Sequence, residues 1–487
     1  MSSLLVIKPD NYYGTNVLSA LFEKIVINYD DTITAIATPP GRGAIGIIRV
    51  SGSKALAITD SIFTPLRAKK LSERKTHTLT FGKIKNAEMI IDEVLIGIML
   101  GKSSFSGEDT VEIYCHGGSV LLQQILNLIV NKGARLAQPG EFTRRAFVNG
   151  KIDLTQAEAV ADLINAPTEL ARRAAVSQLE GNLRKPLNEI REILINILAD
   201  LEAEIDFPDD ISDSSNKNQL LISQLNKIKN KTNLLLKNAD TGRILHDGFQ
   251  IVIAGKPNAG KSSLLNILAS EERALVTDIP GTTRDTLEVD VNIEGFPVRF
   301  IDTAGLRTAR GKVEKHGIAR AKHMISASDM VIWISDISKK TPTAKPVLPD
   351  EINDNKKVIW VWNKCDLPAK QTKNFFQKIN EIFPSVKISA ITGSGINELH
   401  NLIAEKLHKK KILADDDVVL MRVRHINLLR KVLNLINCSL KSLKSNTMSE
   451  LIVMDIRDSL NAVGEITGDF STEDLLDKIF SDFCIGK

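Results

Sequence analysis

Residues 255–262 read Gly-Lys-Pro-Asn-Ala-Gly-Lys-Ser and match the pattern G-x-x-x-x-G-K-[ST]. The mostly apolar residues 249–254 before them predict a buried strand, and we expect a helix to start near Ser263. A glycine-rich turn between a strand and a helix lets backbone N–H groups surround phosphate oxygens at the helix N-terminus. The motif therefore predicts a phosphate-binding loop, and it requires an α/β domain around that loop.

Strand-like runs continue downstream of this loop to about residue 410. They lie at residues 298–301, 330–334, 358–362 and 386–388, with helical or polar segments between them. Such alternation indicates a mostly parallel sheet with helices on both faces. We therefore predict an α/β domain over residues 246–412, with an exposed loop near residues 339–357.

The motif Asp302-Thr303-Ala304-Gly305 follows one of these strands. An aspartate there can reach the Mg²⁺ shell, and Gly305 can bring its N–H group to the γ-phosphate. Residues 281–285 read Gly-Thr-Thr-Arg-Asp and lie where a first switch segment is expected, so one threonine should complete the Mg²⁺ shell. Lys261 should reach the β- and γ-phosphates, and Ser262 should bind Mg²⁺.

A second motif, Asn363-Lys364-Cys365-Asp366, narrows the base that the site can bind. Asp366 can accept hydrogen bonds from N1–H and the exocyclic amine of guanine, which adenine cannot supply. Ser389 and Ala390 follow a further strand and should back the base. The combination predicts a GTPase, with an ATPase as the alternative.

The residue after the Asp-Thr-Ala-Gly motif is Leu306, where Ras-like enzymes use a glutamine to orient water. Leucine cannot do this, so Arg284, Glu314 or a bound cation would have to replace it, or hydrolysis is slow. The residues expected to contact GTP are Asn258, Ala259, Gly260, Lys261, Ser262, Ser263, Thr277, Asp278, Ile279, Pro280, Gly281, Thr282, Thr283, Asp302, Thr303, Ala304, Gly305, Asn363, Lys364, Asp366, Ser389 and Ala390.

Helical patterns lie on both sides of the predicted α/β domain. Apolar residues recur every three or four positions over residues 187–205, 221–228 and 429–443, which predicts helices that each bury one face. We interpret them as a helical bundle, with a coiled coil as the alternative, formed by residues 151–245 and 413–487. Residues 209–218 are expected to form a loop. The last helix is expected to start at Ser471, with Asp474 in a capping box.

The N-terminal part has a different pattern. Short runs rich in Ile and Val at residues 33–37, 44–50, 93–100 and 110–115, with a helix over 118–132, predict a small α/β domain over residues 31–150. Residues 1–30 resemble neither a signal peptide nor a transit peptide, and we interpret them as an extension. No apolar run approaches 18 residues, so no membrane span is expected.

Composition limits the partners and the compartment. Lys and Arg number 63 and Asp and Glu 59, so a net charge of +4 excludes a strongly basic nucleic-acid coat protein. The four cysteines form no C-x-x-C pair, which favours a reduced, cytoplasmic protein without a zinc site or a disulfide scaffold. Any RNA contact must be a local patch. The basic groups Arg172-Arg173, 409–411 and Arg422/Arg424 are more often solvated surface.

Taken together, these motifs resemble the MnmE (TrmE) family of tRNA-modification GTPases, within the TrmE-Era-EngA-like P-loop GTPases. The resemblance runs from about Asp31 to Lys487. Besides the nucleotide motifs, its most specific parts are residues 38–46, 139–143 and 464–468 and the tail Cys484-Ile485-Gly486-Lys487. It implies a P-loop GTPase domain inserted in a helical bundle domain, with an N-terminal α/β domain that binds folate and forms a homodimer.

The resemblance also implies an activity. The family acts with the flavoprotein MnmG (GidA), in a heterotetramer, to add an aminomethyl or carboxymethylaminomethyl group at C5 of the wobble uridine of tRNA. The one-carbon unit comes from 5-formyl- or methylene-tetrahydrofolate. Arg49, Glu108, Lys151 and Lys487 correspond to folate-site positions. Arg and Lys suit the glutamate tail of folate, and a carboxylate suits the pterin N–H groups. Without the resemblance, these four charged residues would be interpreted as surface charges.

Potassium activation is a further implication of the resemblance. Asn258, Thr277, Ile279 and Thr282 correspond to K⁺ ligands, and Ser262 and Thr283 correspond to Mg²⁺ ligands. Glu314 corresponds to the water-orienting glutamate, so that the cation and Glu314 together replace the missing glutamine.

Cys484 corresponds to a residue near the folate and is a candidate for the modification chemistry. The alternative is a small buried apolar residue at a helix end. Prenylation fits poorly, because the chain reads Gly486-Lys487 where a C-a-a-X box needs other residues.

Two other functions are compatible with the nucleotide motifs. One is a ribosome-assembly GTPase that binds RNA without modifying it, although no KH-like or second GTPase module is evident. The other is a nucleotide-gated dimeric scaffold without chemistry of its own.

Overall fold

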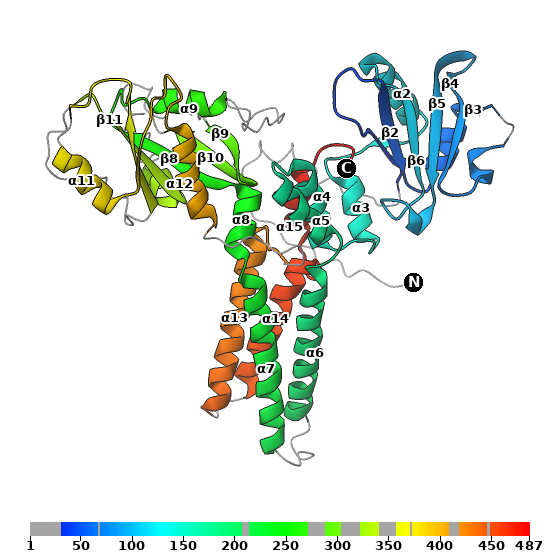
Figure 1. The fold of residues 1–487 in the computed structure, drawn as a ribbon. Helices are drawn as coiled ribbons and strands as arrows, with labels where there is room; N and C mark the ends of the chain where they lie inside the picture. The colour runs from blue at the N-terminus through cyan, green and yellow to red at the C-terminus, as the bar shows by residue number, and fades with distance from the viewer. Residues whose placement is uncertain are drawn as a thin grey trace, which may run out of the picture. The chain divides into compact units, whose positions relative to one another are not determined.

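The structure is a computed structural model that describes residues 31–66, 69–206, 214–270, 288–302, 322–339, 357–370, 373–408, 418–445 and 449–487. Two compact units are present (Figure 1). Unit 1 contains the residues up to Lys151 together with Cys484–Lys487, and unit 2 contains Ile152–Phe483.

Unit 1 is built on a seven-stranded sheet with the strand order β3-β4-β5-β6-β2-β1-β7. Its pairs are antiparallel except β1–β7, which is parallel. The elements are β1 (Ile33–Ile36), β2 (Ile45–Ser51), α1 (Ala55–Asp60), β3 (Phe63–Pro65), η1 (Leu71–Glu73), β4 (Thr78–Asn86), β5 (Met89–Met99), η2 (Gly101–Ser103), β6 (Thr110–His116), α2 (Ser119–Asn131), β7 (Arg135–Leu136) and α3 (Glu141–Val148).

The two faces of this sheet differ. Alternate residues of β4, β5 and β6, among them Ile96 and Ile113, form a core with apolar side chains of α1 and α2. Successive residues of a strand point to opposite faces. Leu79, Phe81 and Leu95 therefore lie on the other face, where they remain 64%, 44% and 42% exposed. The sheet thus has one covered face and one apolar face open to solvent.

The helical part of unit 2 contains a bundle of α6 (Arg184–Asp206), α7 (Ser214–Leu236), α13 (Val423–Lys444) and α14 (Ser449–Thr467). The apolar stripes of the sequence, such as Leu187, Ile190 and Leu194, form its core. The other helices are α4 (Leu154–Asn165), α5 (Glu169–Leu179), α8 (Ala239–Asp247) and α15 (Glu473–Ser481).

Two sequence expectations for these helices are wrong in detail. The polar stretch expected to be a loop up to residue 218 is helical from Ser214, because the helix buries Leu225 and Ile228 further on. The N-cap of α15 is Thr472, not Ser471, since the Thr472 hydroxyl accepts the N–H of Leu475 at 3.3 Å.

A buried ion-pair cluster joins α4 to α13. Glu158 is 1% exposed, and its carboxylate contacts Arg424 at 3.0 Å and His425 Nε2 at 2.8 Å. Burial raises the pKa of Glu158, but the interactions with His425, Arg424 and Arg422 outweigh this and bring its pKa down to about 2. The cluster therefore holds an ionised carboxylate inside the helical part.

The chain between α8 and α13 forms a six-stranded sheet with the order β13-β12-β11-β8-β10-β9. All pairs are parallel except β9–β10. Apolar residues fill both faces, one towards α9 and α12 and the other towards α11. The elements are β8 (Phe249–Gly255), α9 (Lys261–Ala269), β9 (Glu288–Ile293), β10 (Phe296–Asp302), β11 (Met330–Asp336), β12 (Val358–Asn363), α11 (Lys373–Ile382), β13 (Ser385–Lys387) and α12 (Ile396–His408).

The predicted fold class is confirmed. A mostly parallel α/β domain is inserted between helices of a bundle, and an α/β sheet domain precedes both. In the described parts of the chain, no helix combines the length and the apolar character needed to cross a bilayer.

Candidate functional site

The loop between β8 and α9 has the geometry of a phosphate cradle. Gly255 has φ +151°, and a Cβ atom there would lie 2.3 Å from the carbonyl oxygen of Ile334. Gly260 has φ +99°, and a Cβ atom there would lie 2.1 Å from Asn363 Nδ2. Any larger residue would therefore clash at both ends of the loop. The two glycines of the motif let the backbone turn tightly into α9, whose N-terminal N–H groups favour an anion.

Lys261 begins α9 and is only 8% exposed. Its ammonium group donates to the carbonyl oxygens of Gly255 at 3.3 Å and Lys256 at 3.2 Å. These bonds hold a buried positive charge against the loop. A phosphate oxygen can replace the carbonyl acceptors, because a charged acceptor forms the stronger bond.

Ser262 and Asp302 bring the end of β10 to the start of α9. The Ser262 hydroxyl donates to Asp302 Oδ2 at 2.9 Å, and Asp302 is fully buried. A hydroxyl and a carboxylate beside a phosphate loop are oxygen ligands of the type that Mg²⁺ prefers. The two residues therefore fit the predicted magnesium site.

Asn363 connects the phosphate loop to the predicted base-binding loop. Its Nδ2 donates to the carbonyl oxygen of Ala259 at 2.9 Å, and its Oδ1 accepts the N–H of Ala390 at 3.0 Å. The side chain is 2% exposed. Phosphate loop and base loop are thus held together by one amide.

The neighbouring Lys364 is held in a similar way. Its ammonium group lies 2.7 Å from Asp336 Oδ2 and donates to the carbonyl oxygen of Asn258 at 3.1 Å. Burial raises the pKa of Asp336, but hydrogen bonds from Lys364 and Ser338 outweigh this, so that its pKa is lowered overall. Asp366 follows on the surface, where it is exposed and can face a ligand.

The structure therefore brings the predicted phosphate loop, residues 255–262, together with the predicted base-binding residues 363–366, 389 and 390. Ser263 is exposed in the first turn of α9, and Ser389 is buried behind the base loop. The remaining predicted residues lie outside the described part of the chain: Thr277, Asp278, Ile279, Pro280, Gly281, Thr282, Thr283, Thr303, Ala304, Gly305 and Glu314.

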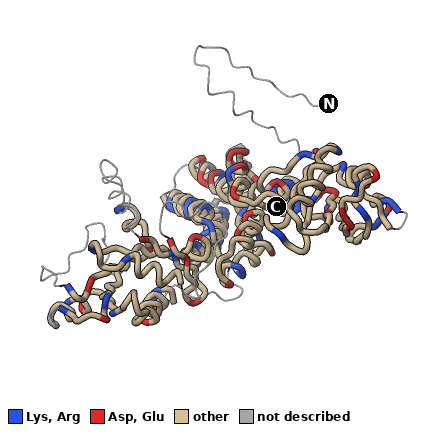
Figure 2. The backbone as a smooth tube through the Cα atoms, turned by 90° about the horizontal axis from the view of Figure 1, so that it is seen from above, with Lys and Arg blue, Asp and Glu red and all other residues tan. Residues whose placement is uncertain are grey.

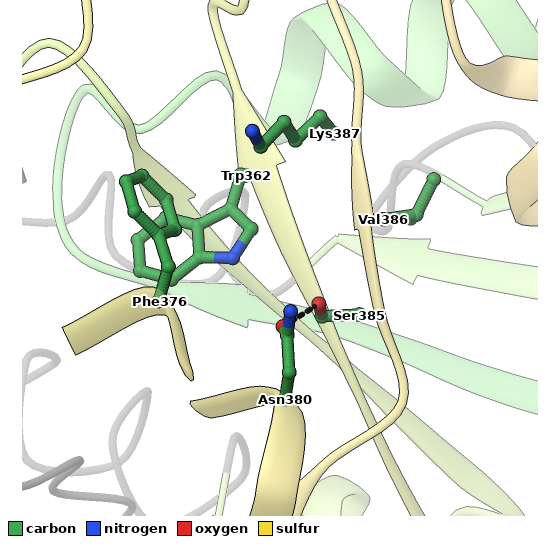
Figure 3. Close-up of a pocket in the computed structure, with 6 residues that line it drawn as sticks. All are labelled: Trp362, Phe376, Asn380, Ser385, Val386 and Lys387. Atoms are coloured by element: carbon green, nitrogen blue, oxygen red, sulfur yellow. Dashed lines mark hydrogen bonds between the residues drawn. The ribbon is translucent and has the colours of Figure 1, made fainter. Parts of the chain in front are cut away.

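The same domain also contains a pocket that none of the predicted nucleotide-binding residues lines. This cavity of about 350 Å³ is lined by side chains of β12, β13 and α11, which Figure 3 shows. The Trp362 and Phe376 rings meet edge to face with centroids 4.8 Å apart, and the Lys387 ammonium lies 5.1 Å from the Phe376 centroid. Trp362 directly precedes Asn363 and so points to the opposite sheet face. These contacts pack α11 on the sheet.

In unit 1, the last four residues of the chain lie against β1 and α3. The N–H of Gly140 donates to the carbonyl oxygen of Cys484 at 3.4 Å, and that of Phe142 donates to the backbone oxygen of Lys487 at 3.2 Å. Gly486 has φ +96°, and a Cβ atom there would lie 2.6 Å from the carbonyl oxygen of Ile36. The tail fits only because this residue is glycine.

Arg49 clamps the tail from the sheet. Its guanidinium donates to the carbonyl oxygen of Gly486 at 3.2 Å and pairs with Glu112 at 2.8 Å. The rings of Phe105 and Phe142 flank it, with centroids 5.4 and 5.5 Å from the guanidinium carbon. Arg49 is therefore already neutralised by one carboxylate and holds the tail with a second bond.

Glu108 lies on the same side of β2, because it accepts the Ser51 hydroxyl at 2.9 Å, and Ser51 is two residues after Arg49. The fully buried Arg145 approaches Glu108 at 3.2 Å. The structure thus places Arg49, Glu108 and the tail on one side of the strand. Lys151 is exposed after α3, and no contact of its side chain is described.

Cys484 is exposed, so the interpretation of a small buried apolar residue is wrong. The tail lies along the surface of unit 1 instead of in a core. The supporting residues Glu112, Arg145, Phe105 and Ser51 were missed by the sequence analysis. No local pattern marks them, although the segment 139–143 was recognised and now has a role, since its N–H groups bind the tail.

Comparisons with known proteins agree with this layout. Residues 32–151 match the family described as the GTP-binding protein TrmE N-terminus, and residues 154–484 match the MnmE helical domain. A tRNA modification GTPase MnmE from Alkaliphilus oremlandii is 44% identical over 460 residues, covering 94% of this chain and 99% of that protein. Its counterpart from Clostridioides difficile is 42% identical over 458 residues, with the same coverages.

Among solved structures, the G domain of the T. maritima FeoB iron transporter matches 32% of this chain and 98% of its own at 28% identity. Its TM-score of 0.24 is too low to bear on the fold. The two family matches and the near-complete relatives suffice without it. This chain belongs to the MnmE (TrmE) family.

Proposed function

We propose that this protein is a GTPase that acts in the modification of tRNA. The observation that supports GTP binding is the pair of hydrogen bonds made by Asn363, which connects the phosphate loop at Ala259 to the base loop at Ala390. Asp366, exposed beside that bridge, supplies the guanine-specific acceptor. Family membership carries the tRNA half, since relatives with near-complete coverage are named tRNA modification GTPases.

In this proposal, the chain's own residues bind and orient the triphosphate. Lys261 moves from the loop carbonyls to the β- and γ-phosphates, and the α9 N–H groups hold the phosphate oxygens. Ser262, Asp302 and Thr283 would hold Mg²⁺, which when bound neutralises charge between the phosphates. Asn258, Thr277, Ile279 and Thr282 would hold K⁺, and Glu314 would orient water. Of these last five, only Asn258 lies in the described part of the chain.

The finer function follows the family resemblance. We propose that the protein acts with the flavoprotein MnmG on C5 of the wobble uridine, using a tetrahydrofolate one-carbon unit, in the cytoplasm. Arg49, Glu108, Lys151 and Lys487 would bind the folate, with Cys484 beside it. The common side of β2 occupied by Arg49, Glu108 and the tail supports this assignment.

We further propose a homodimer formed through unit 1. The support is the open sheet face, where Leu79, Phe81 and Leu95 are 42–64% exposed. An apolar patch of this kind on a sheet typically marks a protein interface. Pairing two copies across the patch would remove those side chains from water.

The experiment is mass spectrometry of tRNA nucleosides from source cells with and without the gene. We expect 5-aminomethyl-type wobble uridines to disappear and to return with the wild-type gene, but not with Glu314→Ala. Re-expression of Cys484→Ser tests the tail separately, with GTP hydrolysis as its control. Unchanged uridines beside intact GTP hydrolysis would contradict the tRNA assignment and favour a ribosome-assembly GTPase.

A further inference from the structure

The four bundle helices carry unequal charge. Helix α7 has four lysines and no acidic residue, and α13 has five lysines and arginines and no acidic residue. Helix α6 has three basic and six acidic residues, and α14 has one basic and four acidic residues. The near-neutral whole chain therefore contains a bundle with two basic and two acidic helices.

The two basic helices are neighbours. Helix α13 contacts α7 and α14, and α6 contacts α14 and α7, so the helices surround their core in the order α6-α14-α13-α7. Figure 1 shows α7 and α13 side by side, and Figure 2 shows the Lys and Arg residues and the Asp and Glu residues along the backbone, seen from above. One side of the bundle is thus basic and the opposite side acidic.

The basic side chains are accessible. Lys227, Arg430, Lys431 and Lys441 are exposed, and none of the acids in the described residues lies within ion-pair distance of them. The ion pairs described on these helices are Lys231 with Glu189, and Arg424 and His425 with Glu158. The pKa of Glu189 is lowered by Lys231 and also by Lys227, so Lys227 faces one acid of α6 beyond ion-pair distance. Cations that no acid neutralises at close range attract a polyanion, whereas a solvated helix face normally mixes both signs.

The surface between the cations is also suited to a nucleic acid. Exposed amides at Asn226, Asn230, Asn233, Asn427 and Asn434 lie on the same two helices. Amide side chains donate to phosphate and sugar oxygens. A helix of 23 residues is about 35 Å long, enough to follow several consecutive phosphates.

We propose that the face formed by α7 and α13, called here the basic face, binds the sugar-phosphate backbone of RNA. This inference rests on the proposed function, in which the RNA is tRNA, and adds where it docks. Binding through phosphates is insensitive to sequence and strongly dependent on salt. The basic face would therefore hold and orient the tRNA, and base selection would take place elsewhere.

The test uses the full-length protein and unfractionated tRNA, with affinity measured from 50 to 300 mM KCl. The variant replaces Lys227, Arg430, Lys431 and Lys441 by Gln. Each lost phosphate contact lowers the slope of log K against log salt by about 0.7–0.9. If two to four of these side chains contact phosphates, the slope falls by about 1.4–3.6, and affinity at 100 mM falls about 25-fold or more.

Two control variants test whether a loss of tRNA affinity comes from the positive charge at these four positions, from the change of net charge alone or from misfolding. Exchanging Lys for Arg and Arg for Lys at the same four positions keeps the charge and should keep the wild-type slope. Replacing the exposed Lys69, Lys70, Lys75 and Lys132 of unit 1 by Gln makes the same change of net charge and should also keep it. All variants should share the thermal unfolding midpoint of the wild type, because the replaced side chains point outwards.

The inference is overturned if the Gln variant keeps the wild-type slope, or if the unit 1 control loses as much affinity. It is also overturned if the Gln variant binds tRNA normally but no longer co-purifies with the flavoprotein, since the face would then bind protein. Nucleoside analysis of cells with the wild-type gene reports separately on the proposed function. If tRNA modification is normal with the wild-type gene while the Gln variant keeps the wild-type salt slope, the basic face is refuted as an RNA site and the proposed function stands.

Discussion

Replacing Asn363 by Ala tests the bridge between the phosphate and base loops. The change deletes two hydrogen bonds of 2.9 and 3.0 Å and leaves the Ala259 carbonyl and the Ala390 N–H without this partner. A neutral bond contributes about 0.5–1.5 kcal/mol net, so the pair is worth about 1–3 kcal/mol. This corresponds to a rise of roughly 5- to 150-fold in the nucleotide Kd.

The two bonds reach the phosphate loop and the base loop but not the γ-phosphate. We therefore expect the affinities for GTP and GDP to fall by the same factor, measured by titration with fluorescent nucleotides in the presence of Mg²⁺. The preference for guanine over adenine should persist, because Asp366 is unchanged.

Asn363→Asp provides a sharper comparison, because it is nearly isosteric. One carboxylate oxygen can still accept the Ala390 N–H, but the other would face the carbonyl oxygen of Ala259. Two acceptors at that distance repel, so Asp should bind nucleotide more weakly than Ala. The reasoning would be refuted by an Asp variant that binds like the wild type, or by an Ala variant that loses GTP affinity alone.

Three further changes have distinct signatures. Glu158→Gln should lower the free energy of unfolding by about 3 kcal/mol at pH 7, because the pKa of Glu158 is about 2 in the folded protein and ordinarily 4.5. This contribution is fully present above pH 4.5 and is lost as the pH falls towards 2. The thermal unfolding midpoints of wild type and variant should therefore converge near pH 2. Gly486→Ala should release the tail, raising amide hydrogen exchange at Gly140 and Phe142 while GTP hydrolysis persists; unchanged exchange would contradict the fit. Asp366→Asn should lower GTP affinity at least tenfold and improve binding of xanthosine triphosphate, and equal losses for both nucleotides would contradict its role in base recognition.

The nucleotide domain was largely predictable from sequence, for a physical reason. Its central strands are buried on both faces and therefore appear as continuous apolar runs, as at residues 251–254 and 358–362. The phosphate loop requires glycine where the backbone meets Ile334 and Asn363. A chemical requirement of this kind leaves a local mark that can be read directly.

Helix ends and weakly patterned strands were harder. Ser471 and Thr472 are both good N-caps, and only the hydrogen bond to Leu475 decides between them. Strand β4, Thr78–Asn86, was not predicted, because it exposes Leu79 and Phe81 on a face that carries apolar residues. Polar and apolar residues do alternate there, but Leu79 and Phe81 lie on the exposed face while Thr80 and Gly82 lie on the buried one, and the phase changes at Gly82.

The tail site could not be derived from local patterns at all. Arg49 and Gly486 are 437 residues apart, and neither neighbourhood signals the other. Glu112, which neutralises Arg49, and Arg145, which supports Glu108, are ordinary charged residues in the sequence. Family resemblance pointed to Arg49, Glu108 and the tail, and the geometry explains how the protein holds them together.

The contact between Arg49 and Gly486 can form only after nearly the whole chain has been translated. A ribosome adds about 5–20 residues per second, so about 20–90 s pass between the emergence of the two partners. The strands of unit 1 are complete by residue 136, but the contacts of the tail with β1 and α3 cannot form until translation reaches residue 486. A nascent chain stalled anywhere in between would therefore carry a folded N-terminal unit without its tail. Unit 1 is thus completed only after the intervening domains have been synthesised.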